Sequence, residues 1–160
     1  MSALLTVENL TVQLPAGGSP RTVLRDVSLA IAPGEALGLV GESGSGKSMT
    51  ARAIDRLLPP GAQASGSIAF SNQNVLGATS QELRRYRADV AMIFQDPRAH
   101  TNPVRRIGDF MTEALRAQGV SSDEARQRAV DMLTSVGISD GARRLRQYPH
   151  ELSGGMLQRV

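Results

Sequence analysis

Apolar and polar residues alternate loosely near the start of the chain, in two stretches at 4–14 and 25–31. Both stretches are rich in Val, Leu, Ile and Thr, which suits strands with one buried face. The intervening residues 15–20, PAGGSP, combine proline, glycine and serine and predict a turn or short loop. We therefore expect a small N-terminal sheet.

Nearly continuous apolar runs follow at 36–40 and 90–94. Such short runs are typical of strands buried on both faces of a mainly parallel sheet, and the first follows a predicted turn at Pro33-Gly34. Between the two runs, apolar residues recur at helical spacing over 48–58, until Pro59-Pro60 ends the pattern. This succession of strand, loop, helix and strand predicts an α/β fold.

From residue 103 the pattern becomes helical, with amphipathic stretches at 105–119 and 121–137. The second stretch begins with a capping box at 121–124, SSDE, and ends at Gly137, a residue type that commonly follows a helix C-terminus. We expect helices over both stretches.

The two patterns divide the chain into two parts. We expect an α/β core over 1–102 and a helical subdomain over 103–160. Within the first part, the capping box Thr79-Ser-Gln-Glu82 predicts one further short helix, which is basic.

Composition excludes several classes of function. With 41% hydrophobic and 21% charged residues, the chain of 160 residues is globular. Its net charge of +3 comes from 17 scattered arginines and one lysine, and only 3% of residues are aromatic, so we expect no nucleic-acid partner. The absence of cysteine excludes disulfides and thiolate chemistry. No stretch approaches the ~20 apolar residues of a spanning helix, so membrane contact is expected only through partners.

A glycine-rich stretch between the first apolar run and the following helix has the clearest chemistry. Residues 41–48, GESGSGKS, fit the pattern G-x-x-x-x-G-K-[ST]. Its glycines let the backbone N–H groups turn toward a phosphate, and the following helix adds the positive end of its dipole. The candidate nucleotide-binding residues are Gly41, Glu42, Ser43, Gly44, Ser45, Gly46, Lys47, Ser48 and Met49. The alternative is a glycine-rich turn without a ligand.

Two side chains of this loop have distinct predicted roles. Lys47, the one lysine of the chain, is a flexible point charge for the β- and γ-phosphates, a role that a planar guanidinium fills poorly. The Ser48 hydroxyl is a predicted ligand for Mg²⁺. The expected ligand is a nucleoside triphosphate with Mg²⁺, although kinases, GTPases, helicases and transport ATPases share this loop.

Two later stretches narrow the choice among the families that share this loop. Gln95 follows the second apolar run in VAMIFQDP, and YPHELSGGMLQRV stands at the end of the sequence. Together with GESGSGKS, in this order, they make the chain resemble the ATP-binding subunits of ABC transporters, which carry a Walker A loop, a Q-loop and an LSGGQ-type signature. GLVGESGSGKS, MIFQDP and NPVRRIGDFMTEAL resemble the branch that powers import of dipeptides, oligopeptides and nickel.

The resemblance implies a role for each motif. Gln95 would sense Mg²⁺ and the attacking water, as a metal ligand beside Ser48, and relay their state to the membrane subunits. The signature would hold the γ-phosphate of ATP bound on the opposite subunit, and its serine is a favoured N-cap at a helix end that attracts anions. The alternative for the signature is an ordinary capped helix. The signature residues are Leu152, Ser153, Gly154 and Gly155.

The resemblance also implies partners and a location. A subunit of this kind binds ATP and Mg²⁺, pairs with a second copy or a paralogous ATP-binding subunit, and contacts membrane permease subunits. It would lie at the cytoplasmic face of the membrane as a peripheral subunit. There it would couple ATP binding and hydrolysis to uptake of peptides or nickel.

Three features depart from the branch. Leu157 stands where arginine is usual, and DPRAHTNP replaces a more usual EPxxSLNP, which together imply an altered surface toward the membrane partner. Leu14 lies near the place where many relatives carry an aromatic residue that stacks on adenine. Apolar contact with the base remains open to a leucine.

Family members also need a Walker B acid, an adjacent catalytic glutamate and a switch histidine, all beyond the signature. We expect this sequence to be the N-terminal portion of such a subunit, marginally stable and without turnover of its own. Asp96 could be taken for the magnesium acid, but Gln95 and Pro97 beside it fit a Q-loop better. His100 and His150 precede the signature, so we expect both to be surface or structural residues.

Two other functions stay open. One is a soluble ABC ATPase outside transport, acting in translation or DNA repair, against which NPVRRIGDFMTEAL and the modest net charge argue. The other is a non-catalytic remnant that binds nucleotide or an intact partner without hydrolysis. Neighbouring permease genes would favour the importer over the soluble ATPase.

Overall fold

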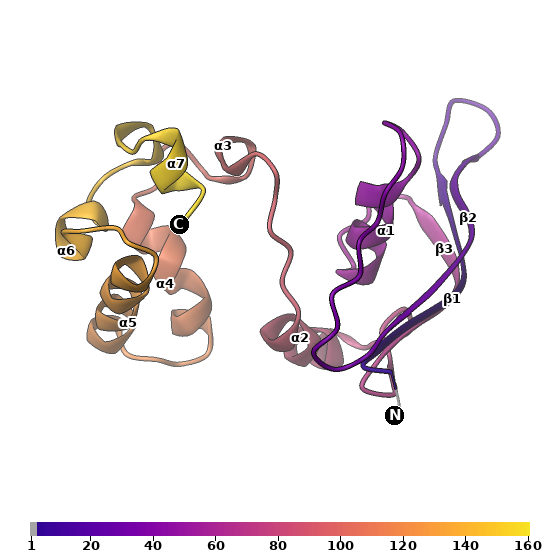
Figure 1. Ribbon diagram of the computed structural model, residues 1–160, viewed down its shortest axis with the longest axis horizontal. Coiled ribbons are helices and arrows are strands. Elements are labelled where there is room, and N and C mark those ends of the chain that lie inside the picture. The colour runs from indigo at the N-terminus through magenta and orange to yellow at the C-terminus, as the bar shows by residue number, and fades with distance from the viewer. Residues whose placement is uncertain (1–2) are drawn as a thin grey trace. The chain divides into compact units, whose positions relative to one another are not determined.

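The computed structural model describes residues 3–160, which fall into two compact units that meet in the sequence between Ile93 and Phe94 (Figure 1). The first unit combines an antiparallel sheet with two helices, and the described residues of the second are helical or irregular. The expected α/β class, with an N-terminal antiparallel piece and a helical part after it, is confirmed. The division into an ATPase core over 1–102 and a helical subdomain over 103–160 stays a prediction.

The sheet of the first unit has four antiparallel strands in the order β2-β1-β3-β4. Its strands are β1 (Leu5–Leu14), β2 (Arg21–Ile31), β3 (Gln63–Phe70) and β4 (Gln73–Asn74). β1 and β2 confirm the two predicted strands. β3 is not predicted by the sequence, because glycine and serine interrupt the alternation of its apolar residues.

A bulge in β1 keeps its apolar side chains on one face of the sheet. Val7 and Leu10 are both buried, which strict alternation along a strand would not allow. The pairing of β1 with β3 shifts register between Glu8 and Thr11, where Asn9 has a φ of 50°. The bulge therefore resets the alternation and returns the next apolar residues to the core.

Helix α1 (Lys47–Ile54) packs against this sheet and has the candidate loop at its N-terminal end (Figure 1). It confirms the helix predicted over 48–58, although it ends earlier. Ala53 is fully buried, and Met49 packs against the same core. The buried core residues are Leu5, Val7, Leu10, Val12, Leu24, Ala53, Ile68, Val75 and Tyr86. Burial of this helix face thus fixes the place of the loop.

Helix α2 (Ser80–Asp89) begins at the predicted capping box, with both hydrogen bonds formed. Thr79 N donates to Glu82 Oε2 at 2.7 Å, and Glu82 N donates to Thr79 Oγ1 at 3.4 Å. The hydrogen bond from the Thr79 backbone lowers the pKa of Glu82 below its usual value. This helix also contributes Tyr86 to the core, where its hydroxyl donates to the Ile54 carbonyl at 2.9 Å and burial raises its pKa to about 12.

Neither apolar run predicted as a buried strand forms one. Residues 36–40 and 90–94 have no strand assignment, and Val40 is 98% exposed and Ile93 93% exposed. A parallel strand exists through hydrogen bonds to its neighbours, and no strand in the described residues pairs with either run. The prediction of strands buried on both faces is wrong for these residues, and the large apolar side chains at 36–40 are exposed instead.

The second unit packs short and medium helices around a core of its own (Figure 1). Its helices are α3 (Pro97–His100), α4 (Ile107–Ala117), α5 (Ser122–Ser135), α6 (Gly141–Arg144) and α7 (Gly154–Leu157), with a 3₁₀ turn at Pro149–Glu151. α4 and α5 confirm the two predicted amphipathic helices. The buried residues of this core are Ile107, Ala129, Leu133, Ile138, Leu145, Leu152 and Leu157.

The ends of α5 match the sequence prediction, but the place of Leu157 does not. Ser121 Oγ accepts a hydrogen bond from Glu124 N at 3.3 Å, and Gly137 follows the helix with a φ of 74°. Leu157 is only 2% exposed, so the prediction that it alters an exposed surface is wrong: a leucine here fills the core instead.

Within residues 3–160, no helix is long and apolar enough to cross a membrane.

Candidate functional site

The candidate phosphate loop, residues 41–48, lies at the N-terminal end of α1. Gly46 is the N-cap residue, with a φ of 95°, and no side chain caps the helix. Gly44 also has a positive φ, 85°. Because the first N–H groups of a helix have no partner within it, this end offers free donors and a positive dipole to an anion.

Leu24 of β2 limits the shape of this loop. A Cβ atom at Gly46 would lie 2.5 Å from Leu24 Cδ2, well inside contact distance. Leu24 is 4% exposed and belongs to the core of the first unit, so it has little room to move. Glycine at position 46 therefore suits both the left-handed φ and the close approach of Leu24. No local pattern in the sequence reveals this role of Leu24.

Lys47 folds back over its own loop. Its Nζ donates to the carbonyl oxygens of Gly41 at 2.7 Å and Glu42 at 2.6 Å, and to Ser45 Oγ at 3.2 Å. These contacts use all three donors of the ammonium group. A phosphate would offer negatively charged acceptors in place of neutral carbonyls, so the ammonium group would gain an attraction between opposite charges. The lysine is therefore poised to exchange loop carbonyls for phosphate oxygens.

The two residues after Lys47 have different surroundings. Ser48 is exposed, so its hydroxyl is open to solvent. Met49 packs against the core, which leaves only its backbone N–H to a ligand at the loop. Thr50 Oγ1 donates to the Gly46 carbonyl at 3.1 Å and so closes the first turn of α1.

Gln95 and a signature glycine line one cavity in the second unit. The cavity has a volume of about 280 Å³, and both Gln95 and Gly154 are among its lining residues. Asp96, next to Gln95, is the N-cap of α3, with its Oδ1 accepting from Arg98 N at 2.9 Å. Asp96 therefore acts as a helix cap and does not end a strand.

Both histidines stack on aromatic neighbours. The ring centroids of His100 and Phe94 lie 3.8 Å apart with an interplanar angle of 12°, and His100 Nδ1 is 2.9 Å from the Asp96 carbonyl oxygen. His150 stacks on Tyr148 at 5.7 Å. Both histidines are exposed, and each contacts an aromatic ring of its own segment.

The signature residues begin helix α7. Ser153 is its N-cap and accepts a hydrogen bond from Met156 N at 3.3 Å, while Leu152 is 4% exposed and anchored in the core. Gly154 and Gly155 are exposed, and a Cβ at either would meet no other atom within 4 Å. The backbone of both glycines is therefore open to an approaching group.

Arg159 holds this short helix in place, a role that sequence reasoning missed. Its Nε donates to the Gly155 carbonyl at 3.0 Å, and its Nη1 donates to the Val136 carbonyl at 3.0 Å. The second bond joins α7 to the C-terminal end of α5, across 23 positions of the sequence. A separation of that size leaves no local signal for the contact.

Both the sequence and the fold match known proteins. The ABC transporter family profile matches residues 24–160. The chain is 44% identical to the oligopeptide transport ATP-binding protein OppD of Mycobacterium tuberculosis, over 100% of this chain and 27% of that protein. It is 46% identical to the probable D,D-dipeptide transport ATP-binding protein DdpD of Escherichia coli, over 98% of this chain and 49% of that protein, so it spans about half or less of these relatives. Its structure matches the ATP-binding cassette MJ0796, solved as a dimer in a post-hydrolysis state bound to ADP and Pi, with a TM-score of 0.80 and 27% identity, over 97% of this chain and 66% of that one.

Proposed function

Because the chain belongs to the ABC transporter family, we propose that it forms the nucleotide-binding part of an ATP-binding subunit that drives peptide import. The main support for this proposal is the arrangement of the loop at residues 41–48. At residues 41–48, an uncapped helix end, two glycines with positive φ and the Lys47 ammonium group come together. The ligand that this arrangement suits is ATP with Mg²⁺.

Each part of the loop has one task in binding. The backbone N–H groups of residues 44–48 donate to phosphate oxygens, while the dipole of α1 favours the negative charge. Lys47 gives up the carbonyls of Gly41 and Glu42 and binds the β- and γ-phosphates. The exposed Ser48 hydroxyl is a ligand for Mg²⁺, which when bound neutralises phosphate charge. The metal role expected of Gln95 stays a prediction.

We infer that Mg²⁺ arrives with the nucleotide and does not occupy a site of its own. Within residues 3–160, no group of three or more His, Cys, Asp or Glu side chains could hold a metal ion. Mg²⁺ commonly binds through one or two protein oxygens together with waters and substrate phosphates. A single serine hydroxyl beside a phosphate loop fits that mode of binding.

Ser48→Ala tests the metal role separately from phosphate binding. We expect affinity for Mg-ATP to fall about two- to tenfold, the range of one neutral hydrogen bond, and affinity for ATP in EDTA to stay unchanged. Calorimetric titration with and without Mg²⁺ measures both. Ser19→Ala, in the exposed loop between β1 and β2, is the control. An equal loss with and without Mg²⁺ would contradict the role of Ser48.

The names of the relatives point to the transported substrate. OppD is named for oligopeptide transport and DdpD for D,D-dipeptide transport, which supports peptides as the solute. The whole protein acts at the cytoplasmic face of the membrane with permease subunits and a second ATP-binding subunit, whose nucleotide meets Ser153, Gly154 and Gly155.

Deleting the gene should abolish uptake of a labelled dipeptide by the cell. Uptake at the parental rate in the deletion strain would rule out this assignment.

A further inference from the structure

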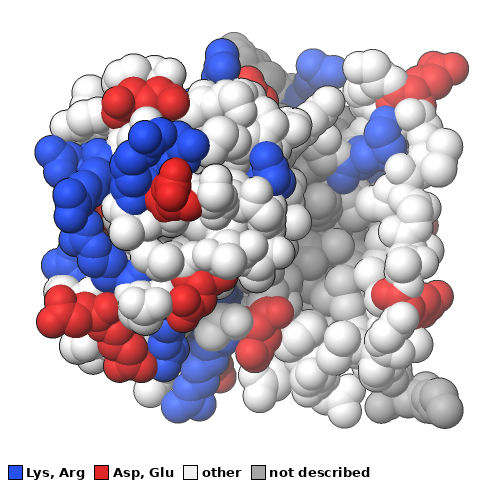
Figure 2. All heavy atoms as spheres, turned by 60° about the vertical axis from the view of Figure 1, so that its left-hand side comes forward, with Lys and Arg blue, Asp and Glu red and all other residues white. Residues whose placement is uncertain are grey.

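A cleft in the second unit gathers four arginines around one small cavity. The cavity has a volume of about 170 Å³ and lies between α4, α5 and the segment after α6. Asp109 is the one acidic side chain among its described lining residues. Figure 2 shows basic side chains gathered on one side of this unit. The four arginines of the cleft are Arg106, Arg116, Arg126 and Arg146.

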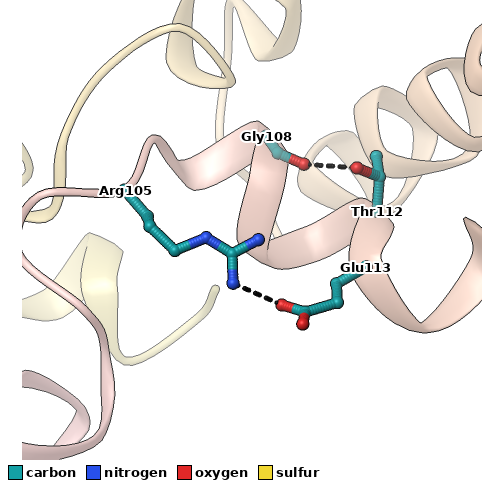
Figure 3. A network of polar contacts seen from close by, with 4 residues as sticks. All are labelled: Arg105, Gly108, Thr112 and Glu113. Carbon is teal, nitrogen blue, oxygen red and sulfur yellow. Dashed lines mark hydrogen bonds and ion pairs between the residues drawn. The ribbon is translucent and has the colours of Figure 1, made fainter.

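None of the four cleft arginines forms a salt bridge with a described residue, whereas two other arginines of this unit do. Two salt bridges occur within residues 3–160, Arg105 with Glu113 and Arg128 with Glu124, each at 2.6 Å. Figure 3 shows the first of these pairs at α4. Neither pair involves a cleft arginine, so four positive side chains and one negative side chain, Asp109, leave a formal charge of +3 around the cavity.

Backbone contacts hold the walls of this cleft together. Ile107 N donates to the Gln147 carbonyl at 2.9 Å, and Gly108 N donates to the Leu145 carbonyl at 2.8 Å. A Cβ at Gly108 would lie 2.7 Å from the Leu145 carbonyl oxygen, so α4 approaches this segment as closely as glycine permits. Thr112 Oγ1 donates to the Gly108 carbonyl at 2.7 Å and is satisfied within α4 (Figure 3). The free polar groups of the cleft are therefore mainly its guanidinium groups.

One of these arginines is already oriented. The Arg106 guanidinium lies over the Tyr148 ring, with its Cζ 5.8 Å from the ring centroid. A guanidinium held against an aromatic face loses less conformational freedom when it binds a ligand. Together with the fixed walls, this contact favours a preformed anion site.

We propose that the cleft binds a phosphate group, as an anion site additional to the phosphate loop of the first unit. Guanidinium groups match phosphate through paired N–H···O bonds, and a concave basic surface concentrates anions. The cavity is smaller than the ~300–1,000 Å³ of sites that enclose whole small molecules, so it takes only the compact head of its ligand. A phosphate monoester, with a charge of about −1.5 to −2 at neutral pH, balances the surrounding charge better than one carboxylate does.

The test first weakens phosphate binding at the loop of the first unit and then measures phosphate binding at the cleft. Inorganic phosphate is titrated into the ¹⁵N-labelled chain carrying Lys47→Ala, and the backbone amide signals of Gly108 and Thr112 are followed. We expect saturable shifts. Adding Arg116→Gln with Arg126→Gln should raise the Kd at least tenfold, because two charge-assisted contacts are lost.

A matched double variant distinguishes a specific phosphate site from general electrostatic attraction to a basic surface. Arg105→Gln with Arg128→Gln removes the same charge from the same region, but at side chains already in salt bridges, and should leave the Kd within about twofold. Arg146→Gln alone, on a different element, should weaken binding to a lesser degree than the double cleft variant. An equal loss in the matched pair and in the cleft pair overturns the proposal.

The source of the phosphate is decided by further probes. Glycerol phosphate represents a soluble monoester, and phosphatidylcholine vesicles with and without phosphatidic acid represent a lipid headgroup. Preference for either source supports a phosphate site and identifies its ligand class. Absence of saturable shifts with every phosphate probe, or tighter binding of a glutamate-rich peptide than of phosphate, overturns it. These results do not depend on whether the loop of the first unit binds ATP.

Discussion

We expect the Lys47→Ala chain to bind Mg-ATP at least tenfold more weakly than the unaltered chain. A charge-assisted hydrogen bond contributes about 1.5 to 3 kcal/mol, which corresponds to roughly ten- to 150-fold in affinity. The Lys47 ammonium already lies within 2.7 Å of the Gly41 and Glu42 carbonyl oxygens, so it is at the loop before a nucleotide arrives. Isothermal titration calorimetry measures the difference.

Two further variants make this result specific. Lys47→Arg keeps the charge in a planar, branched group and should restore only part of the affinity. Arg52→Ala, in the last turn of α1, removes one positive charge away from the loop and should change affinity less than twofold. Unchanged affinity in Lys47→Ala, or the same loss in Arg52→Ala, would refute the assigned role.

Gly46→Ala should destabilise the first unit by roughly 3 kcal/mol, the second large effect. The φ of 95° is strained for any residue with a Cβ, by about 1–2 kcal/mol. The added methyl group would also lie 2.5 Å from Leu24 Cδ2, and overpacking of this kind costs about 1–3 kcal/mol. Urea unfolding, followed by circular dichroism, measures the loss of stability.

The same loop offers a control for the steric part of this effect. Gly44 has a φ of 85°, but a Cβ there would meet nothing within 4 Å. Gly44→Ala should therefore lower the free energy of unfolding only by the cost of backbone strain, about 1–2 kcal/mol. Leu24→Ala should destabilise the Gly46→Ala chain less than it destabilises the unaltered chain, because the smaller side chain makes room for the new methyl group. Equal losses at Gly44 and Gly46, with additive behaviour of Leu24→Ala, would contradict the steric account.

The strands and helices that could be predicted are those whose own residues determine them. α5 is predicted from its apolar spacing, its Ser121 cap and Gly137, all within the helix or next to it. β3 could not be predicted, since its interrupted pattern becomes a strand only through pairing with β1. The run at 36–40 shows the converse: its residues suit a buried strand, but without a paired neighbour they form none.

Some parts of the candidate site could likewise be predicted from the sequence, and others could not. The loop at 41–48, with its lysine and its glycines, is evident from consecutive residues and the elements on either side. The support that Leu24 gives to Gly46, and the bond from Arg159 to the Val136 carbonyl, join residues far apart in the sequence. Such contacts leave no pattern that local reading could detect.

By itself, the sequence determined the candidate phosphate loop, the helix caps and the order of the motifs, because each depends on residues within a few positions of one another. Only the tertiary structure decided that Leu157 is a core residue and that four arginines share one cleft. In the sequence those arginines are scattered and read as separate solvated charges. Packing of α4 against α5 and the segment after α6 brings them around one cavity, where their charges add.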